Sequence, residues 1–251
     1  MSNQLYEFIS SVVLDADIAL IAAADAQLIS GATSATDLQA LSIARGEAWR
    51  QLRARNVFSD EIPTIAIDGD PVSGLTVEER TVLALIARLN LSVHDAALVM
   101  SMKEKAVDGL LKTARRELAR TGIAMTLMTN PSKCPVIAQF HSTLNGVMNR
   151  GSVMSLVSHS AECSICVPVL RTVDKQIVSQ YIAAPRVQVP TEIVPLLQRD
   201  TAPLIERATL NAGWAPNERD RNSTFHVKRA IVYGFLSTLL IAIGIVVALQ
   251  N

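Results

Sequence analysis

Residues 75–118 read LTVEERTVLALIARLNLSVHDAALVMSMKEKAVDGLLKTARREL. The stretch contains three helix starts, in each of which a Ser or Thr is followed three positions later by an acidic residue that can complete the cap. These pairs are Thr76 and Glu79, Ser92 and Asp95, and Ser101 and Glu104. Three short helices in succession, separated by tight turns, are typical of a helix-turn-helix and also of any small three-helix bundle.

Apolar residues recur at helical spacing behind each of the three starts, so each helix has one face that can be buried. The faces consist of Val82, Leu85, Ile86 and Leu89 in the first helix, Ala96, Ala97 and Met100 in the second, and Val107, Leu110, Leu111, Ala114 and Leu118 in the third. The alanines are small enough to let neighbouring helices approach closely. We therefore predict a helix-turn-helix over residues 75–120.

The regions on either side of this stretch also have helical patterns, and we predict an all-α protein. Residues 1–62 form a helical N-terminal segment, because apolar side chains recur there at spacings of three and four. Residues 63–74 contain Pro and Gly and are predicted to be a linker. Residues 185–229 hold five of the ten prolines and are predicted to be a juxtamembrane spacer, with short helical pieces such as residues 202–210.

The composition excludes several classes of protein. The chain has 251 residues, of which 49% are hydrophobic, so it can bury a core and is not disordered as a whole. Three cysteines are too few for a secreted disulfide scaffold. The 23 basic and 23 acidic residues cancel, unlike the charge of a strong stand-alone DNA-binding protein. We find no Ser/His/Asp arrangement, phosphate-binding loop or paired carboxylates, and predict that the protein is not an enzyme.

A long apolar run lies near the end of the chain. Residues 230–249 read AIVYGFLSTLLIAIGIVVAL, which is 20 residues without a charge. A helix of that length matches the thickness of the hydrocarbon core of a bilayer, so we predict a transmembrane helix. Basic residues lie on its N-terminal side, at Arg219, Arg221, Lys228 and Arg229. The positive-inside rule then predicts a single-pass protein of the cytoplasmic (inner) membrane, with residues 1–229 in the cytoplasm.

The three cysteines and one histidine form a second pattern. His159 precedes Cys163 by four residues and Cys166 by seven, so that on one helix all three would share a face. In a reducing cytoplasm, thiolates and imidazole together favour zinc, which takes four such ligands. We predict Cys134 as the fourth ligand, with His141 as the alternative to it. Four protein ligands leave no open position, so the predicted zinc is structural; the other interpretation is that the cysteines are simply small buried residues.

The stretch from residue 75 to 118 resembles the C-terminal, minus-35-reading domain of extracytoplasmic-function sigma factors in order and spacing. The resemblance is carried by the Leu91-Ser92 turn, the Asp95-Ala96-Ala97 triplet and the terminal Ala114-Arg115 pair. Residues 41–55 faintly resemble the end of the polymerase-binding domain of the same family. This resemblance alone does not decide whether RNA polymerase is a partner. The basic side chains available for phosphate contacts are Lys103, Lys105, Lys112, Arg115 and Arg116.

Residues 131–182 resemble the zinc-containing anti-sigma domain, and we predict a domain over residues 131–184. The signature of that domain is an upstream Cys or His followed by the spacing found at His159, Cys163 and Cys166. The resemblance implies that a helix after the ligands clamps a sigma factor. Here that helix would present an apolar stripe of Leu170, Val173, Ile177 and Tyr181.

Together the two resemblances imply a membrane-tethered bacterial regulator of transcription initiation. In this hypothesis the zinc module clamps either the sigma-like segment of the same chain or a separate sigma factor, and the helix-turn-helix binds promoter DNA. The alternative hypothesis is an anti-sigma or interaction protein that sequesters a separate sigma factor and whose helix-turn-helix no longer binds DNA. Asp108 favours this alternative, because an acidic side chain on the recognition helix repels phosphate.

Overall fold

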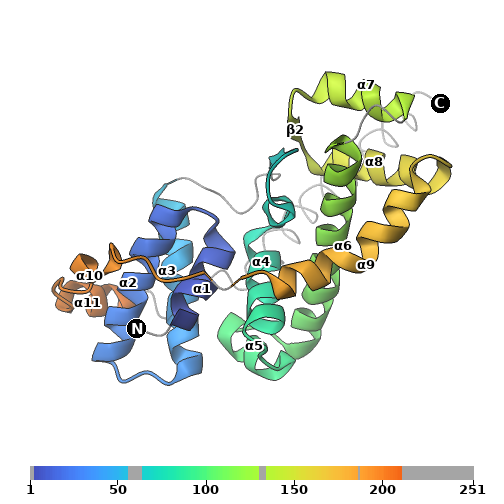
Figure 1. The fold of residues 1–251 in the computed structure, drawn as a ribbon. Coiled ribbons are helices and arrows are strands. Elements are labelled where there is room, and N and C mark those ends of the chain that lie inside the picture. The colour runs from blue at the N-terminus through green and yellow to red at the C-terminus, as the bar shows by residue number, and fades with distance from the viewer. Residues whose placement is uncertain (1–2, 56–63, 130–133, 186, 211–251) are drawn as a thin grey trace, which may run out of the picture. The chain divides into compact units, whose positions relative to one another are not determined.

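The computed structural model describes residues 3–55, 64–129, 134–185 and 187–210 (Figure 1). It is mostly helical, with 76% helix and 2% strand, in agreement with the predicted all-α class. The predicted transmembrane helix, residues 230–249, lies outside the described residues. Among those that are described, no single helix is long and apolar enough to cross a membrane, although the bent pair of residues 150–162 and 167–183 passes by length and composition.

Three helices form the N-terminal region: α1 (Asn3–Val13), α2 (Ala16–Ala32) and α3 (Asp37–Ala54). Asp15 caps α2 by accepting a hydrogen bond from the backbone N–H of Ile18, and Thr36 and Gln39 form a capping box at the start of α3. The alanine-rich α2 lies between α1, α3 and two short helices from the other end of the described chain. The predicted helical character of the N-terminal segment is therefore confirmed up to Ala54.

The predicted helix-turn-helix region consists of α4 (Val77–Leu83), the π-helical segment η2 (Ala84–Arg88), α5 (Val93–Met100) and α6 (Glu104–Thr129). The capping box of Thr76 and Glu79 and the cap at Ser92 are present as predicted. The predicted cap at Ser101 is wrong. Ser101 ends α5 in a left-handed conformation with a φ of 53°, because its N–H closes the last turn of that helix, and α6 begins at Glu104.

Two buried arginines join the N-terminal helices to this region. Arg80 of α4 donates hydrogen bonds to the backbone carbonyls of Val12 at 2.6 Å and Leu75 at 2.7 Å. Burial lowers the pKa of Arg80 to about 10, so its guanidinium is still charged at neutral pH. Arg45 of α3 donates to the carbonyl of Met100, at the end of α5, at 3.1 Å. The two regions share one cluster of buried apolar residues, which we name the main core.

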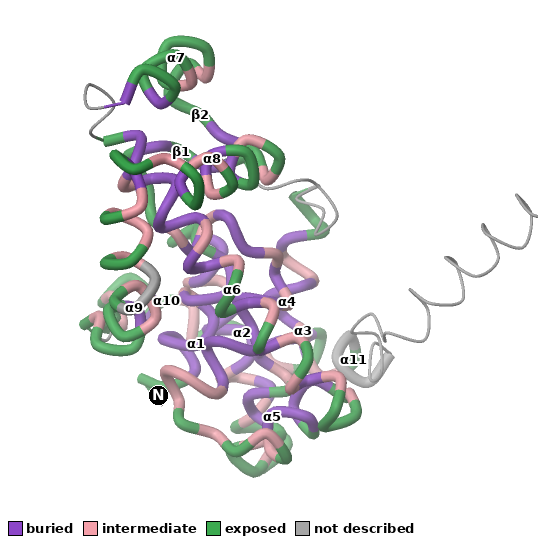
Figure 2. Tube along the Cα trace, turned by 90° about the vertical axis from the view of Figure 1, so that its right-hand side faces the viewer, coloured by how far each residue is buried: buried purple, intermediate pink, exposed green. Residues whose placement is uncertain are grey.

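The long helix α6 connects the main core to a second core. Its first half contributes to the main core and residues 123–128 contribute to the second (Figure 2). Two short strands, β1 (Ile65–Ala66) and β2 (Val147–Met148), pair in antiparallel fashion and place Ile65 opposite Met148. The predicted linker therefore includes a strand that belongs to the second core, followed by the 3-10 helix η1 (Pro71–Gly74).

The remaining elements are α7 (Pro135–Leu144), α8 (Arg150–Glu162), α9 (Val167–Ala183), α10 (Ile193–Leu196) and α11 (Ala202–Leu210). α9 packs on α6, and α8 contacts both helices (Figure 1). In the predicted spacer, α10 and α11 lie against α2, and α11 coincides with the helical piece predicted there. Between them, Arg199 forms an ion pair with the buried Asp25 of α2 at 2.6 Å, so this part of the spacer packs on the N-terminal helices.

Candidate metal centre

The helices α8 and α9 bring three of the predicted ligands to one corner of the chain. His159 lies in the last turn of α8, Cys163 follows that helix in an extended conformation, and Cys166 precedes α9. The prediction that all three share one helix face is wrong, because α8 ends at Glu162 and the chain bends by 113° before α9. Pro168 in the first turn of α9 has no N–H, which suits a helix start and disfavours a helix interior.

Backbone hydrogen bonds fix this corner. The N–H of Cys163 donates to the carbonyl of His159 at 3.0 Å. The N–H groups of Cys166 and Val167 then donate to the carbonyl of Cys163 at 3.0 and 2.9 Å. The two cysteines therefore stand at either end of one tight turn, which is the arrangement that short Cys spacings give at zinc sites.

Cys134 reaches the same place from the start of α7. Its side chain is buried, and its Sγ lies 3.3 Å from Nε2 of His159 and 4.0 Å from Sγ of Cys163. The ligand atoms of Cys134, His159, Cys163 and Cys166 all lie within 4.8 Å of one another. The alternative ligand, His141, is exposed on α7 and is not a member of this group. The four residues are close enough to bind one metal ion.

These separations fit a tetrahedral site. Zinc bonds of about 2.3 Å to sulfur and about 2.0 Å to nitrogen place neighbouring ligand atoms roughly 3.5 to 3.8 Å apart. The observed separations of 3.3 and 4.0 Å lie on either side of that range. Three thiols and one imidazole are also a donor set that zinc favours, so the residues present fit a structural metal.

The thiols differ in their electrostatic environment. The backbone N–H groups of Cys166 and Ile165 lower the pKa of Cys163, which favours the thiolate form that binds a metal. Burial raises the pKa of Cys166 to about 12, so this thiol keeps its proton at neutral pH unless a cation lies beside it. Metal binding at the cluster would therefore release protons.

The cluster forms one side of the second core. Cys134 and Cys166 belong to that core, beside Ile137 of α7 and Val153 and Leu156 of α8. All five side chains are buried. A metal bound by the four ligands would cross-link the starts of α7 and α9 to the end of α8, where few other apolar side chains are buried.

The predicted phosphate contacts lie on α6 and in the turn before it. All five residues are exposed: Lys103, Lys105, Lys112, Arg115 and Arg116. Lys112 forms an ion pair with Asp108 at 2.6 Å, so one of the five positive charges is partly neutralised. Arg115 and Arg116 lie beside side chains of α8 and α9. Four of the basic side chains thus share α6, and two of these four, Arg115 and Arg116, lie next to the segment that carries the metal ligands.

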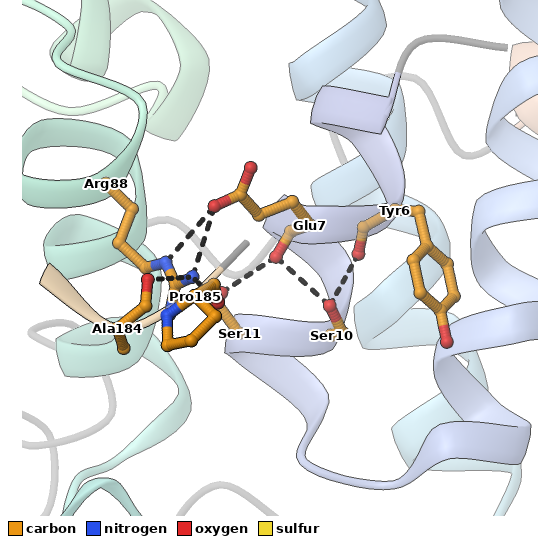
Figure 3. Close-up of polar contacts among 7 residues, drawn as sticks. All are labelled: Tyr6, Glu7, Ser10, Ser11, Arg88, Ala184 and Pro185. Carbon is orange, nitrogen blue, oxygen red and sulfur yellow. Dashed lines mark hydrogen bonds and ion pairs between the residues drawn. The ribbon is translucent and has the colours of Figure 1, made fainter. Parts of the chain in front are cut away.

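Sequence patterns did not identify Arg88, which joins three parts of the chain (Figure 3). Its guanidinium donates to Oε1 of the buried Glu7 in α1 at 3.2 Å and to the carbonyl of Pro185, just after α9, at 3.0 Å. It also lies 5.6 Å from the ring centre of Tyr181, within reach of a cation–π interaction. The signal nearest to this site was the apolar stripe that ends at Tyr181.

Two further contacts join the metal module, which we define as residues 134–183, to the helix-turn-helix region. Arg150 of α8 forms an ion pair at 2.5 Å with Glu79, the acidic member of the capping box of α4. Ile177 of α9 lies so close to Gly122 of α6 that a Cβ at Gly122 would be 2.8 Å from its Cδ1. The predicted stripe is the packing face of α9: Leu170 and Val173 lie on the second core, and Ile177 and Tyr181 on the main core.

No family model, curated protein or solved structure matches the chain. Function is therefore inferred from contacts within the chain itself. The informative ones are the metal cluster, the packing of α9 on α6, and the exposed basic side chains of α6.

Proposed function

We propose that the chain is a membrane-tethered regulator of transcription initiation, in which the metal module holds a sigma-like helix-turn-helix inactive within the same molecule. One observation carries this proposal. α9 packs on α6, the helix that would read DNA, with Ile177 seated on Gly122. Of the two targets that the sequence leaves open for the clamp, this contact favours the segment of the same chain over a separate sigma factor.

In this proposal the metal is structural zinc held by Cys134, His159, Cys163 and Cys166. Zinc would supply folding free energy and no reactive position, because four protein ligands complete its tetrahedron. Three of the ligands lie at the corner from which α9 leaves α8, so a bound metal would reinforce the backbone hydrogen bonds there. Loss of the metal would loosen that corner and, with it, the packing of α9 on α6.

Polar contacts at both ends of the metal module support the same arrangement. At one end, Arg150 pairs with Glu79, a member of the capping box at the start of α4. At the other end, Arg88 binds the carbonyl of Pro185 and lies over the ring of Tyr181. A clamp pinned at both ends opens only when several contacts break together, which is the kind of two-state element that a signal can bias.

The clamp would obstruct part of the surface that binds DNA. Lys103, Lys105 and Lys112 are exposed near the start of α6, whereas Arg115 and Arg116 lie beside α8 and α9. A DNA duplex approaching these two arginines would meet the metal module. Log affinity falls as log salt concentration rises, and each phosphate contact makes that fall steeper by about 0.9. Because the closed form would lose contacts, it should bind DNA weakly and with a shallow salt dependence.

The test is DNA binding with the clamp closed and open, in residues 1–212, which form one compact unit. Gly122→Val should open the clamp because the new side chain needs the space of Ile177; Gly46→Val in the middle of α3 is the matched control, since nothing lies within 4 Å of a Cβ there and α3 has none of the proposed DNA contacts. On a duplex from upstream of its own gene, Gly122→Val should bind at least about tenfold more tightly than wild type between about 50 and about 200 mM salt.

The control variant should bind as weakly as the wild type. Ile177→Ala, which removes the same contact from the side of α9, should act in the direction of Gly122→Val, and circular dichroism should show that all three variants keep their helices. Equal affinity of the wild type and both clamp variants would contradict the proposal that the module masks DNA binding.

The proposed tether is residues 230–249, with residues 1–229 in the cytoplasm. A reporter that works only in the cytoplasm should be active when fused to the N-terminus and inactive when fused after Asn251. The physical reason is that moving the basic cluster of Arg219, Arg221, Lys228 and Arg229 across the bilayer is disfavoured. The reverse pattern would remove the reducing compartment on which the zinc proposal depends.

One feature of the helix-turn-helix region favours a second function. Asp108 pairs with Lys112 and competes with phosphate for it. In this alternative the chain sequesters a separate sigma factor. Asp108→Lys would then raise DNA affinity without a preference for promoter over scrambled duplex, and a sigma factor would co-purify with the full chain.

A further inference from the structure

A hollow of about 430 Å³ lies where α6 passes α8 and α9. Its walls come from all three helices, so it crosses the boundary between the helix-turn-helix region and the metal module. A volume of this size is within the range of small-molecule sites. None of its lining residues is a metal ligand.

One wall of the hollow is basic. Arg115, Arg116 and Arg120 of α6 line it. A single carboxylate serves two of them: Glu117 lies 2.6 Å from Arg120 and 3.6 Å from Arg116. Arg115 has no ion-pair partner among the described residues. With three guanidinium groups and one carboxylate, this wall carries a net positive charge.

Apart from the three arginines, the described residues that line the hollow are apolar. Ile123 of α6 is one of them and is buried, with 4% of its surface exposed. Val157 of α8 and Leu170 and Val178 of α9 are half-buried around it. A ligand that covered the exposed carbon surface of these side chains would contribute about 25 cal/mol of favourable transfer free energy for each Å² removed from water.

We propose that the hollow binds a single-chain amphiphilic anion, with a carboxylate or phosphate head on the arginines and an alkyl chain on the apolar walls. Guanidinium groups pair with either head group through two parallel hydrogen bonds. A fully polar anion would leave the apolar walls unused, and an uncharged hydrocarbon would leave the arginines unused. An acidic protein helix would need a longer groove than a hollow bounded by three helices.

The proposal has a consequence for the clamp, and this step rests on the proposed function. The arginines belong to α6, whereas Val157, Leu170 and Val178 belong to the metal module, so a bound amphiphile would bridge the two. It would also occupy Arg115 and Arg116, two of the proposed phosphate contacts. A ligand that binds the closed form better than the open form shifts the population toward the closed, DNA-free form.

Binding is tested with residues 1–212 and with decanoate or decyl phosphate, below their critical micelle concentrations, by isothermal titration calorimetry. We expect saturable binding of one amphiphile per chain. Decanol, which has the same chain and no charge, should bind at least about tenfold more weakly, because charge-assisted hydrogen bonds are about twice as strong as neutral ones. Decyltrimethylammonium, which has the opposite charge, should not bind.

Matched variants locate the site. Replacing Arg115 and Arg116 together by Gln should weaken decanoate binding at least about tenfold. Replacing Lys105 and Lys112 together by Gln removes the same charge from the same helix outside the hollow and should leave binding unchanged. Val178→Trp should block binding by filling the hollow while the arginines stay intact.

Equal loss in the two double variants would reveal nonspecific charge attraction and overturn the proposal, as would decanol binding as tightly as decanoate. Binding of an acidic amphipathic peptide and of neither amphiphile would also overturn it and assign the hollow to a protein partner. A comparison of the affinities for decanoate and decyl phosphate identifies the preferred head group. The assay contains no DNA, so its failure leaves the proposed function standing, and failure of the DNA experiment leaves this site standing.

Discussion

The main core and the second core differ in what holds them together. Among the described residues, the main core contains 35 buried apolar residues, whereas the second contains 13, including the predicted ligands Cys134 and Cys166. Only four other members of the second core lie in the metal module: Ile137, Met148, Val153 and Leu156. With so few fully buried side chains to offset the conformational entropy of about 50 residues, the small module would gain more from a metal cross-link than the main core would.

The largest expected effect is on the small module alone. Removing the metal with a chelator, or changing Cys163→Ser, should unfold residues 134–183 and leave α1–α5 folded, because structural zinc supplies about 10 kcal/mol or more of folding free energy. Hydrogen exchange should show fast amides in the module and slow amides in the main core. Metal analysis should give close to one zinc per chain for the wild type and little for Cys163→Ser.

His141→Ala is the matched control for the ligand change, because His141 is exposed on α7 and lies outside the cluster. It should retain one zinc per chain and normal exchange rates. Full metal binding by Cys163→Ser would refute the ligand assignment, and slow exchange in a metal-free module would show that its apolar contacts suffice.

The second expected effect concerns the main core. Phe8 is completely buried there, so Phe8→Ala should lower the free energy of unfolding by about 3 to 5 kcal/mol through lost burial and a residual cavity. Zinc content should stay unchanged, since the ligands lie in the other core. Denaturant unfolding and metal analysis on the same sample separate the two results. Loss of zinc together with lost stability would mean that the two cores unfold as one unit.

The parts of this structure that could be predicted depend on residues close together in the sequence. The caps at Thr76 and Ser92 are of this kind, because a side chain and a backbone N–H three residues apart decide them. The ligand cluster could be predicted from residue type and spacing, even though the prediction that His159, Cys163 and Cys166 share one helix was wrong. Metal ligation depends on which side chains converge, whereas the bend at Cys163 depends on where α8 ends and where α9, with Pro168 in its first turn, begins.

The contacts that join the metal module to the rest of the chain could not be predicted in the same way. Arg88 meets Pro185, and Arg150 meets Glu79, across long stretches of chain that no periodic pattern connects. The close approach at Gly122 gives no signal either, since a glycine in the middle of a helix resembles Gly109, where the space is open. Such contacts follow from how helices dock, and local spacing does not record that.

The third expected effect is at the place where the metal module enters the main core. Burial raises the pKa of Tyr181 to about 12, and its hydroxyl has no hydrogen-bond partner in the part of the chain that the structure describes. Because the folded pKa lies above the unfolded value of about 10, the stability that Tyr181 contributes is complete below pH 10 and is lost as pH rises toward 12. That difference corresponds to roughly 2 to 3 kcal/mol.

Tyr181→Phe should remove this part of the alkaline loss. At neutral pH it should be neutral or slightly stabilising, because it deletes a buried hydroxyl without a partner and keeps the ring near Arg88. Chemical denaturation at several pH values between about 8 and about 11 provides the comparison with the wild type. Parallel curves for the two proteins would show that Tyr181 is not buried against the main core.

The smallest expected effect is an exposed ion pair that joins α5 to α6. Nδ1 of His94 lies 2.8 Å from Oε1 of Glu104, and this hydrogen bond, together with the charge of Glu104, raises the pKa of His94 above its ordinary value. The stability from this pair is therefore complete below about pH 6.5 and is lost as pH rises through the raised pKa. Solvent screens the exposed pair, so its effect on stability should be slight beside that of the metal.

The titration itself should still be clear. Glu104→Gln removes the carboxylate and should return the pKa of His94 toward its ordinary value, which proton NMR of the imidazole ring can measure directly. An unchanged pKa of His94 in that variant would mean that His94 does not interact with Glu104 at the start of α6. A raised pKa in the wild type, with stability nearly independent of pH from about 6 to about 8, would show that apolar packing, and not this charge pair, holds the turn between α5 and α6.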